Sequence, residues 1–76
     1  MDERLEELYT TLKEFLDQKQ YVKLREWIRN VNVADIAAMM EELDEEIQLK
    51  MFRILPKDMA ADIFSYLPIE VEQQII

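Results

Sequence analysis

Glycine, cysteine and histidine are all absent from this sequence of 76 residues. Without glycine, the chain cannot form the phosphate-cradling loops and dinucleotide-binding turns that depend on it, and β-hairpins lose their preferred turn residue. Any turn that needs a positive φ angle is expected to use Asn or Asp. Without cysteine there is no disulfide framework, so packing alone must hold the fold together.

Groups able to catalyse a reaction are correspondingly scarce. The lack of histidine and cysteine removes the commonest general base, the usual zinc ligands and the thiol nucleophile. The single serine, Ser65, and the threonines Thr10 and Thr11 have no histidine to activate them. Carboxylates could act alone only as a facing pair in a deep pocket, which thin helical stacks seldom enclose. We therefore expect no enzyme, with a carboxylate enzyme as the remote alternative.

Long apolar runs are also missing, and none approaches the roughly 20 residues needed to cross a bilayer. The amino terminus, MDERLEELYT, is acidic and amphipathic, unlike a signal peptide. These features predict a soluble protein of the cytosol.

The formal net charge of −8 is unevenly distributed. Residues 1–38 hold eight acidic and six basic side chains, whereas residues 39–76 hold nine acidic and three basic ones. Such a surface repels nucleic acid and anionic lipid, and it suits a basic partner or divalent cations. A solvated acidic surface that only aids solubility is the simpler alternative.

Half of the residues are hydrophobic, and good helix formers dominate the composition. Apolar residues at helical spacing predict one helix over residues 2–17 and a second over residues 21–29, separated by the polar segment DQKQ. We expect residues 1–30 to form an N-terminal helical pair, with Trp27 packed between the second helix and the helices that follow.

From Val31 onward the chain repeats every 12 residues. Each unit opens on an apolar residue and continues with Asn, Asp or Pro, which suit a helix start. Further apolar residues recur eight and nine positions after each opener, and the position four after it is apolar in three units and Asp35 in the other. The openers are Val31, Leu43, Leu55 and Leu67; the helix starts are Asn32, Asp44, Pro56 and Pro68; the later apolar positions are Met39, Met51, Ile63 and Ile75, then Met40, Phe52, Phe64 and Ile76.

Helices of about nine residues are marginal alone and survive by stacking on neighbours. We therefore predict an all-α fold of about six helices, in which residues 31–76 form short-helix repeats of a solenoid within the same single domain. The similar segments DIAAMM and DMAADIF lie one two-helix repeat apart, and their alanines allow close approach. Because the last residues are apolar, we expect further helices to follow in a longer protein.

Two acidic clusters are candidate sites. In EELDEE (residues 41–46), Asp44 is expected to cap a helix and Glu46 to pair with Lys50. This cluster lacks the alternating ligands and the glycine of a calcium loop, so a solvated face is the favoured interpretation. The second cluster is Asp58 and Asp62, four residues apart on one helix face.

Asp62 is the stronger candidate, because it lies mid-helix beside the buried stripe, where the helix dipole does not compensate its charge. A carboxylate there could bind a cation shared with a neighbouring domain. Pairing with a nearby Lys or Arg is the alternative. The methionines at positions 39, 40, 51 and 59 are interpreted as core residues and not as ligands.

The run DIAAMMEELDEEIQLKMFRILPKDMAADIFSYLPIEVEQQII resembles the cytosolic N-terminal domain of MgtE-type magnesium transporters. The residues that carry the resemblance are ADIA followed by EEL, then FRILPKDMAADIFSYL and EVEQ. The preceding YVKLREWIRNVN is similar to the family's short second helix, although NVNVAD lacks the proline that usually follows. The flagellar rotor switch protein also contains short Leu-Pro solenoids, so a non-catalytic protein-interaction scaffold is the rival hypothesis.

The resemblance implies a right-handed superhelix of short helices, followed in the full-length homodimer by CBS domains and a membrane pore. It implies a regulatory domain on the cytoplasmic side of the membrane, with no nucleic acid partner and no direct membrane contact. Mg²⁺ bound weakly between this domain and the CBS domains would favour the closed pore. The family's acidic position corresponds to Asp62, with Asp58 as a weaker second metal ligand.

Overall fold

The computed structural model describes residues 2–75 and contains six α-helices in that range. None of the described residues lies in a β-strand, so the predicted all-α fold is confirmed. The predicted helices over residues 2–17 and 21–29 agree with α1 and α2 to within one residue. The helices are α1 (Glu3–Asp17), α2 (Tyr21–Ile28), α3 (Val33–Glu41), α4 (Glu45–Ile54), α5 (Lys57–Tyr66) and α6 (Ile69–Ile75).

The 12-residue period of the sequence is the period of the helices. α3, α4, α5 and α6 begin at residues 33, 45, 57 and 69, which are 12 residues apart. The apolar residue eight positions after the opener is completely buried in three of the four units, and Ile75 in the last unit is partly buried. Ile76 lies outside the described residues. The repeat therefore marks the core positions of successive helices.

Prolines and capping side chains set the helix boundaries. α4 and α5 end before Leu55 and Leu67, the C-cap residues, which have extended backbones because a following proline disfavours the helical conformation. Asn32 caps α3 by accepting a hydrogen bond from the Ala34 amide at 2.8 Å. Asp44 occupies the N-cap position of α4, but its side chain makes no capping hydrogen bond. The predicted position is right, and the predicted hydrogen bond is wrong.

A left-handed residue turns the chain between α1 and α2. Lys19 has a φ angle of 55°, the only positive value among the described residues, so the expectation that Asn or Asp would fill such a position is wrong. The Lys19 amide donates to the Leu16 carbonyl at 3.1 Å, and the Gln20 amide donates to the Phe15 carbonyl at 2.9 Å. These are the two hydrogen bonds of a Schellman motif, which outweigh the steric cost of a side chain in this conformation.

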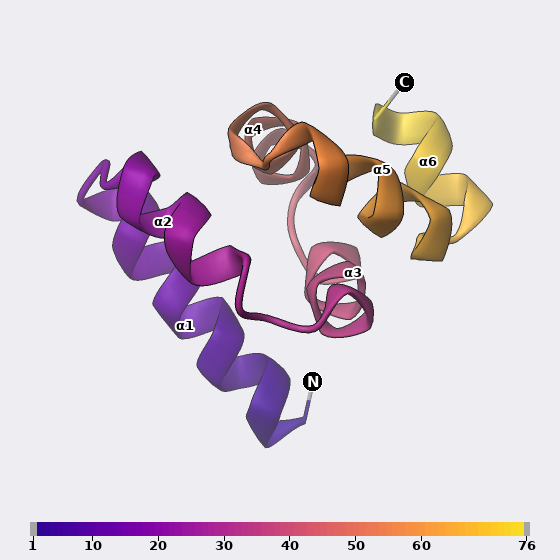
Figure 1. Ribbon diagram of the computed structural model, residues 1–76. Coiled ribbons are helices and arrows are strands. Elements are labelled where there is room, and N and C mark those ends of the chain that lie inside the picture. The colour runs from indigo at the N-terminus through magenta and orange to yellow at the C-terminus, as the bar shows by residue number, and fades with distance from the viewer. Residues whose placement is uncertain (1, 76) are drawn as a thin grey trace.

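Helices that are two apart in the sequence make most of the contacts in the second part of the chain. α3 has its most extensive helix contact with α5, and α4 packs on α6. α1 contacts both α2, which runs alongside it, and α3 (Figure 1). The similar segments DIAAMM and DMAADIF thus lie in the two helices that pack most closely, and Ala37 is buried there.

One apolar cluster connects α1 to the turn after α5. Methionines 39, 40 and 51 are fully buried and Met59 nearly so, which confirms that they are core residues. Trp27 is partly buried, with its ring centroid 5.7 Å from that of Phe15 in α1. The buried members are Leu12, Leu16, Leu24, Ile28, Ile36, Ala37, Met39, Met40, Leu43, Met51, Ile54, Leu55, Met59, Ile63 and Leu67.

Gln48 is the one buried polar residue among those described. Its Nε2 donates a hydrogen bond of 2.7 Å to the Met40 carbonyl near the end of α3, whereas its buried Oε1 has no partner. This hydrogen bond joins the first turn of α4 to the last turn of α3. Lys50, also in α4, does not form the predicted ion pair with Glu46, because its Nζ lies over the Tyr21 ring, 5.6 Å from the centroid.

The left-handed backbone at Lys19 predicts an unusual effect of glycine. Lys19→Gly should raise the free energy of unfolding by about 0.5–1 kcal/mol, since the relief of side-chain crowding exceeds the added flexibility of the unfolded chain. Urea denaturation followed by circular dichroism measures this difference. As a matched control, Lys23→Gly lies inside α2 and should lower stability by about 1 kcal/mol. Destabilisation by both substitutions would contradict the structure at residue 19.

The half-satisfied amide of Gln48 predicts a contrast between two substitutions. Gln48→Met loses one hydrogen bond but also removes the unpartnered oxygen, so stability should change by less than about 1 kcal/mol. Gln48→Glu replaces the donor with a second buried acceptor that carries charge, and should cost about 2–4 kcal/mol at neutral pH. The same denaturation measurement compares them. Equal stability of the two variants would mean that residue 48 is exposed to water.

Candidate functional site

The candidate carboxylates lie on α5, which begins directly after the Leu55–Pro56 turn. Pro56 occupies the N-cap position, and its carbonyl accepts the first hydrogen bond of the helix from the Ala60 amide at 2.9 Å. Asp58 therefore falls in the first turn, where the helix dipole stabilises negative charge. Asp62 follows one turn later, on the same side of the helix.

Both carboxylates face solvent beside the buried stripe of α5. Asp58 and Asp62 are exposed, whereas the residues directly after them, Met59 and Ile63, are buried. Successive helical residues are about 100° apart, so each aspartate lies to the side of a core-facing residue. The sequence placed Asp62 correctly at the edge of the packing face.

Asp58 has a basic neighbour from α2. Arg29 Nη1 lies 3.5 Å from Asp58 Oδ2, with side chains 55% and 72% exposed. The sequence left pairing with a Lys or Arg open for Asp62, but the structure shows such a pair at Asp58. The separation of 29 residues carries no local sequence signal, so Arg29 could not be identified as the partner. An exposed pair at this distance is weak, about 0–1 kcal/mol.

A second arginine, Arg25 in α2, contacts the turn between α4 and α5. Arg25 Nε donates a hydrogen bond of 2.7 Å to the carbonyl of Ile54, the last residue of α4. A cation at the C-terminal end of a helix is favoured by the dipole. Arg25 and Arg29 thus join α2 to the end of α4 and the start of α5. Neither contact was predicted from the sequence.

Asp62 differs from Asp58 because it forms no ion pair within residues 2–75. Ser65 Oγ donates a hydrogen bond of 2.6 Å to the backbone carbonyl of Asp62, and not to its carboxylate. Tyr66, one turn after Asp62, is 61% exposed, and Ile69 at the start of α6 is 64% exposed. The face of α5 that carries Asp62 therefore combines an unpaired carboxylate with an exposed tyrosine.

The cluster EELDEE does not gather into a site. Its five acidic side chains are all exposed, around the end of α3 and the start of α4. Among the residues that the structure describes, no three Asp or Glu side chains come together closely enough to hold a metal ion. Asp58 and Asp62 thus supply at most part of a coordination shell.

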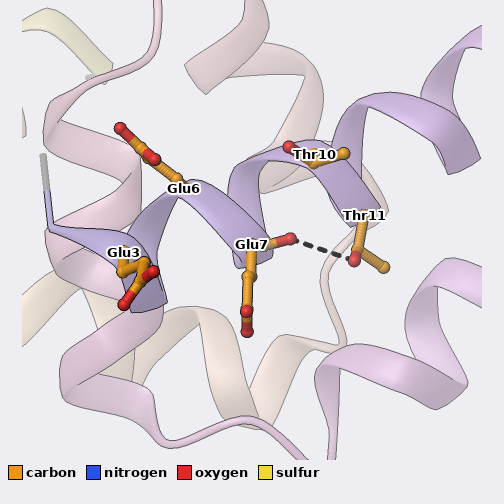
Figure 2. Close-up of a pocket in the computed structure, with 5 residues that line it drawn as sticks. All are labelled: Glu3, Glu6, Glu7, Thr10 and Thr11. Atoms are coloured by element: carbon orange, nitrogen blue, oxygen red, sulfur yellow. Dashed lines mark hydrogen bonds between the residues drawn. The ribbon is translucent and has the colours of Figure 1, made fainter.

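A shallow hollow on α1 is lined by acidic and hydroxyl side chains, but it belongs to a single helix. Figure 2 shows Glu6 and Glu7 pointing to opposite sides of that helix. Thr11 Oγ1 donates to the Glu7 carbonyl at 3.0 Å and is thereby occupied (Figure 2). The hollow therefore offers no convergent set of groups for catalysis or ligand binding. Its lining residues are Glu3, Glu6, Glu7, Thr10 and Thr11.

Across residues 2–75, none of the helices combines the length and the apolar character that crossing a membrane requires. Comparison of the sequence with curated proteins and with solved structures gave no match.

Comparison with family models matched the MgtE intracellular N domain over residues 31–76, which is more than half of the chain. The matched segment begins at the first residue of the 12-residue repeat and contains both Asp58 and Asp62. This is a family of transporter domains and not of enzymes, and it is related to magnesium. The resemblance that the sequence suggested is thus confirmed, and the chain belongs to the family of MgtE N domains of magnesium transporters.

Proposed function

We propose that the chain is a regulatory, magnesium-sensing module of a magnesium transporter, acting on the cytoplasmic side of the membrane. In this proposal Mg²⁺ bridges Asp62, and secondarily Asp58, to acidic groups of adjacent CBS domains, and the bridged state favours a closed pore. When the magnesium concentration falls, the acidic domains repel one another and separate. The full-length protein would act as a homodimer.

The observation that carries this proposal is the unpaired carboxylate of Asp62 on an exposed face inside the family-matched segment. Mg²⁺ prefers oxygen ligands and keeps several waters, so one or two carboxylates from each domain suffice for a shared ion. The net charge of −8 makes docking onto another acidic surface dependent on cations. Exposed Tyr66, one turn after Asp62, adds apolar area to the proposed docking face.

The proposed architecture extends the contacts between helices two apart. Regular stacking of α3 on α5 and of α4 on α6 is the local pattern from which a right-handed superhelix would be built. We propose that residues 1–30 form an N-terminal helical pair and residues 31–76 the short-helix repeats of the same domain. Such a module would neither transport ions nor catalyse a reaction by itself.

The incomplete ligand set predicts weak binding to the chain alone. Titration calorimetry with MgCl₂ should give a dissociation constant of about 1 mM or weaker, because most ligands of the ion remain water. A titration with NaCl at equal ionic strength controls for general screening of the acidic surface. A low-micromolar constant would contradict a site that needs a second domain.

Removal of the unpaired carboxylate should change gating in a transporter that carries this chain. Asp62→Asn is expected to raise the Mg²⁺ concentration for half-maximal closure by about three- to tenfold, because the shared ion loses a charged ligand. Magnesium flux measured against the internal Mg²⁺ concentration gives this midpoint.

Asp17→Asn is the matched control for that experiment, since it removes the same charge from an exposed aspartate in α1. It should leave the midpoint of closure within about twofold of wild type, because the remaining effect is only long-range electrostatics. An unchanged midpoint in Asp62→Asn, or equal shifts in the two variants, would show that Asp62 is not the ion contact.

A further inference from the structure

Arg29, at the C-cap of α2, places a positively charged side chain beside Asp58, one of the two candidate ligands. We propose that Arg29 competes with Mg²⁺ for the carboxylate of Asp58, and thereby sets the concentration at which the ion occupies the α5 face. This inference rests on the proposed function, because it describes the regulation of the same carboxylates. It assigns Asp58 and Asp62 different roles.

The position of Arg29 is determined by its neighbour one turn earlier. Arg25 is held by its 2.7 Å hydrogen bond to the Ile54 carbonyl, a partly buried contact. Arg29 lies four residues later, at the C-cap of α2 and so on the same side. Its guanidinium therefore lies close to the first turn of α5, where Nη1 approaches Asp58 Oδ2 to 3.5 Å.

Arg29 lies in a basic segment of a chain that is otherwise acidic. Residues 19–30 contain four basic side chains and one acidic one, whereas residues 31–76 contain ten acidic and three basic ones. Residues 19–30 are thus a positive segment in a chain of net charge −8, and Arg25 and Arg29 of this segment contact the acidic segment at the α4–α5 turn. A guanidinium and a hydrated divalent cation both seek the same carboxylate oxygens.

The contact is weak enough to be displaced. Both partners are more than half exposed, so water competes with the ion pair and salt screens it. Binding of Mg²⁺ to Asp58 then requires loss or weakening of the Arg29 contact, and the two equilibria are linked. Asp62, without such a partner in the described chain, is available to the ion at lower concentration.

The test is a MgCl₂ titration of the 76-residue chain at constant ionic strength, followed by NMR through the side-chain carboxyl signals of Asp58 and Asp62. Arg29→Gln should lower the apparent dissociation constant reported by Asp58 about two- to fivefold relative to Lys23→Gln, the effect of removing an exposed ion pair. Lys23→Gln is the charge-matched control, since exposed Lys23 makes no ion pair among residues 2–75.

A second variant and a second signal separate competition from a general charge effect. Arg29→Lys keeps the net charge and should stay within about twofold of wild type, because an ammonium can still approach the carboxylate. In the wild-type chain, the Arg29 Nε–H signal should shift with the same midpoint as Asp58. Circular dichroism of each variant checks that the helices are retained.

The outcomes distinguish this inference from the proposed function. If Arg29→Gln and Lys23→Gln give the same constant at Asp58 while Asp62→Asn weakens binding, competition by Arg29 is overturned and the magnesium site survives. If neither carboxyl signal responds to Mg²⁺ in any variant, both are overturned. A larger gain at Asp58 in Arg29→Gln than in Lys23→Gln, with Arg29 responding in the wild type, supports the inference.

Discussion

The structure depends on stacking between helices that are too short to be stable in isolation. α3 to α6 contain between seven and ten residues each, below the length at which an isolated helix is stable in water. Each packs through the residue eight positions after its unit's opener, which is completely buried in α3, α4 and α5 and partly buried in α6. The exposed face of α5 is therefore placed by packing on its opposite side, and residues there are free to vary in chemistry.

Local rules predicted the helices, because each rule involves neighbours in the sequence. The Leu-Pro dipeptides end α4 and α5, and Asn32 starts α3, as their backbone preferences require. Lys19 was missed because its conformation follows from the hydrogen bonds of the Schellman motif and not from its own preference. The family resemblance could be identified for the same reason: the repeat is a local pattern.

Contacts across the chain could not be predicted, and these decide the chemistry of the candidate site. Asp58 and Asp62 look equivalent in the sequence, as two aspartates one turn apart. The fold makes them different by bringing Arg29 to one of them from 29 residues away. Likewise, Lys50 had a plausible partner at helical spacing in Glu46, but its Nζ instead lies over the ring of Tyr21 from α2. Tertiary packing overrides a weak local ion pair.

An exposed, incomplete site suits the proposed role better than a closed one. A complete cage of carboxylates would hold its ion at all times and would not respond to changes in concentration. In the proposed docking, two solvent-facing aspartates on a strongly acidic chain would repel a second acidic surface until an ion screens them. Docking and ion binding then become one linked equilibrium, in which each strengthens the other by the same factor. In the proposed role, the affinity for the ion would therefore depend on the distance between the two acidic surfaces, and a change in that distance would be passed to the pore.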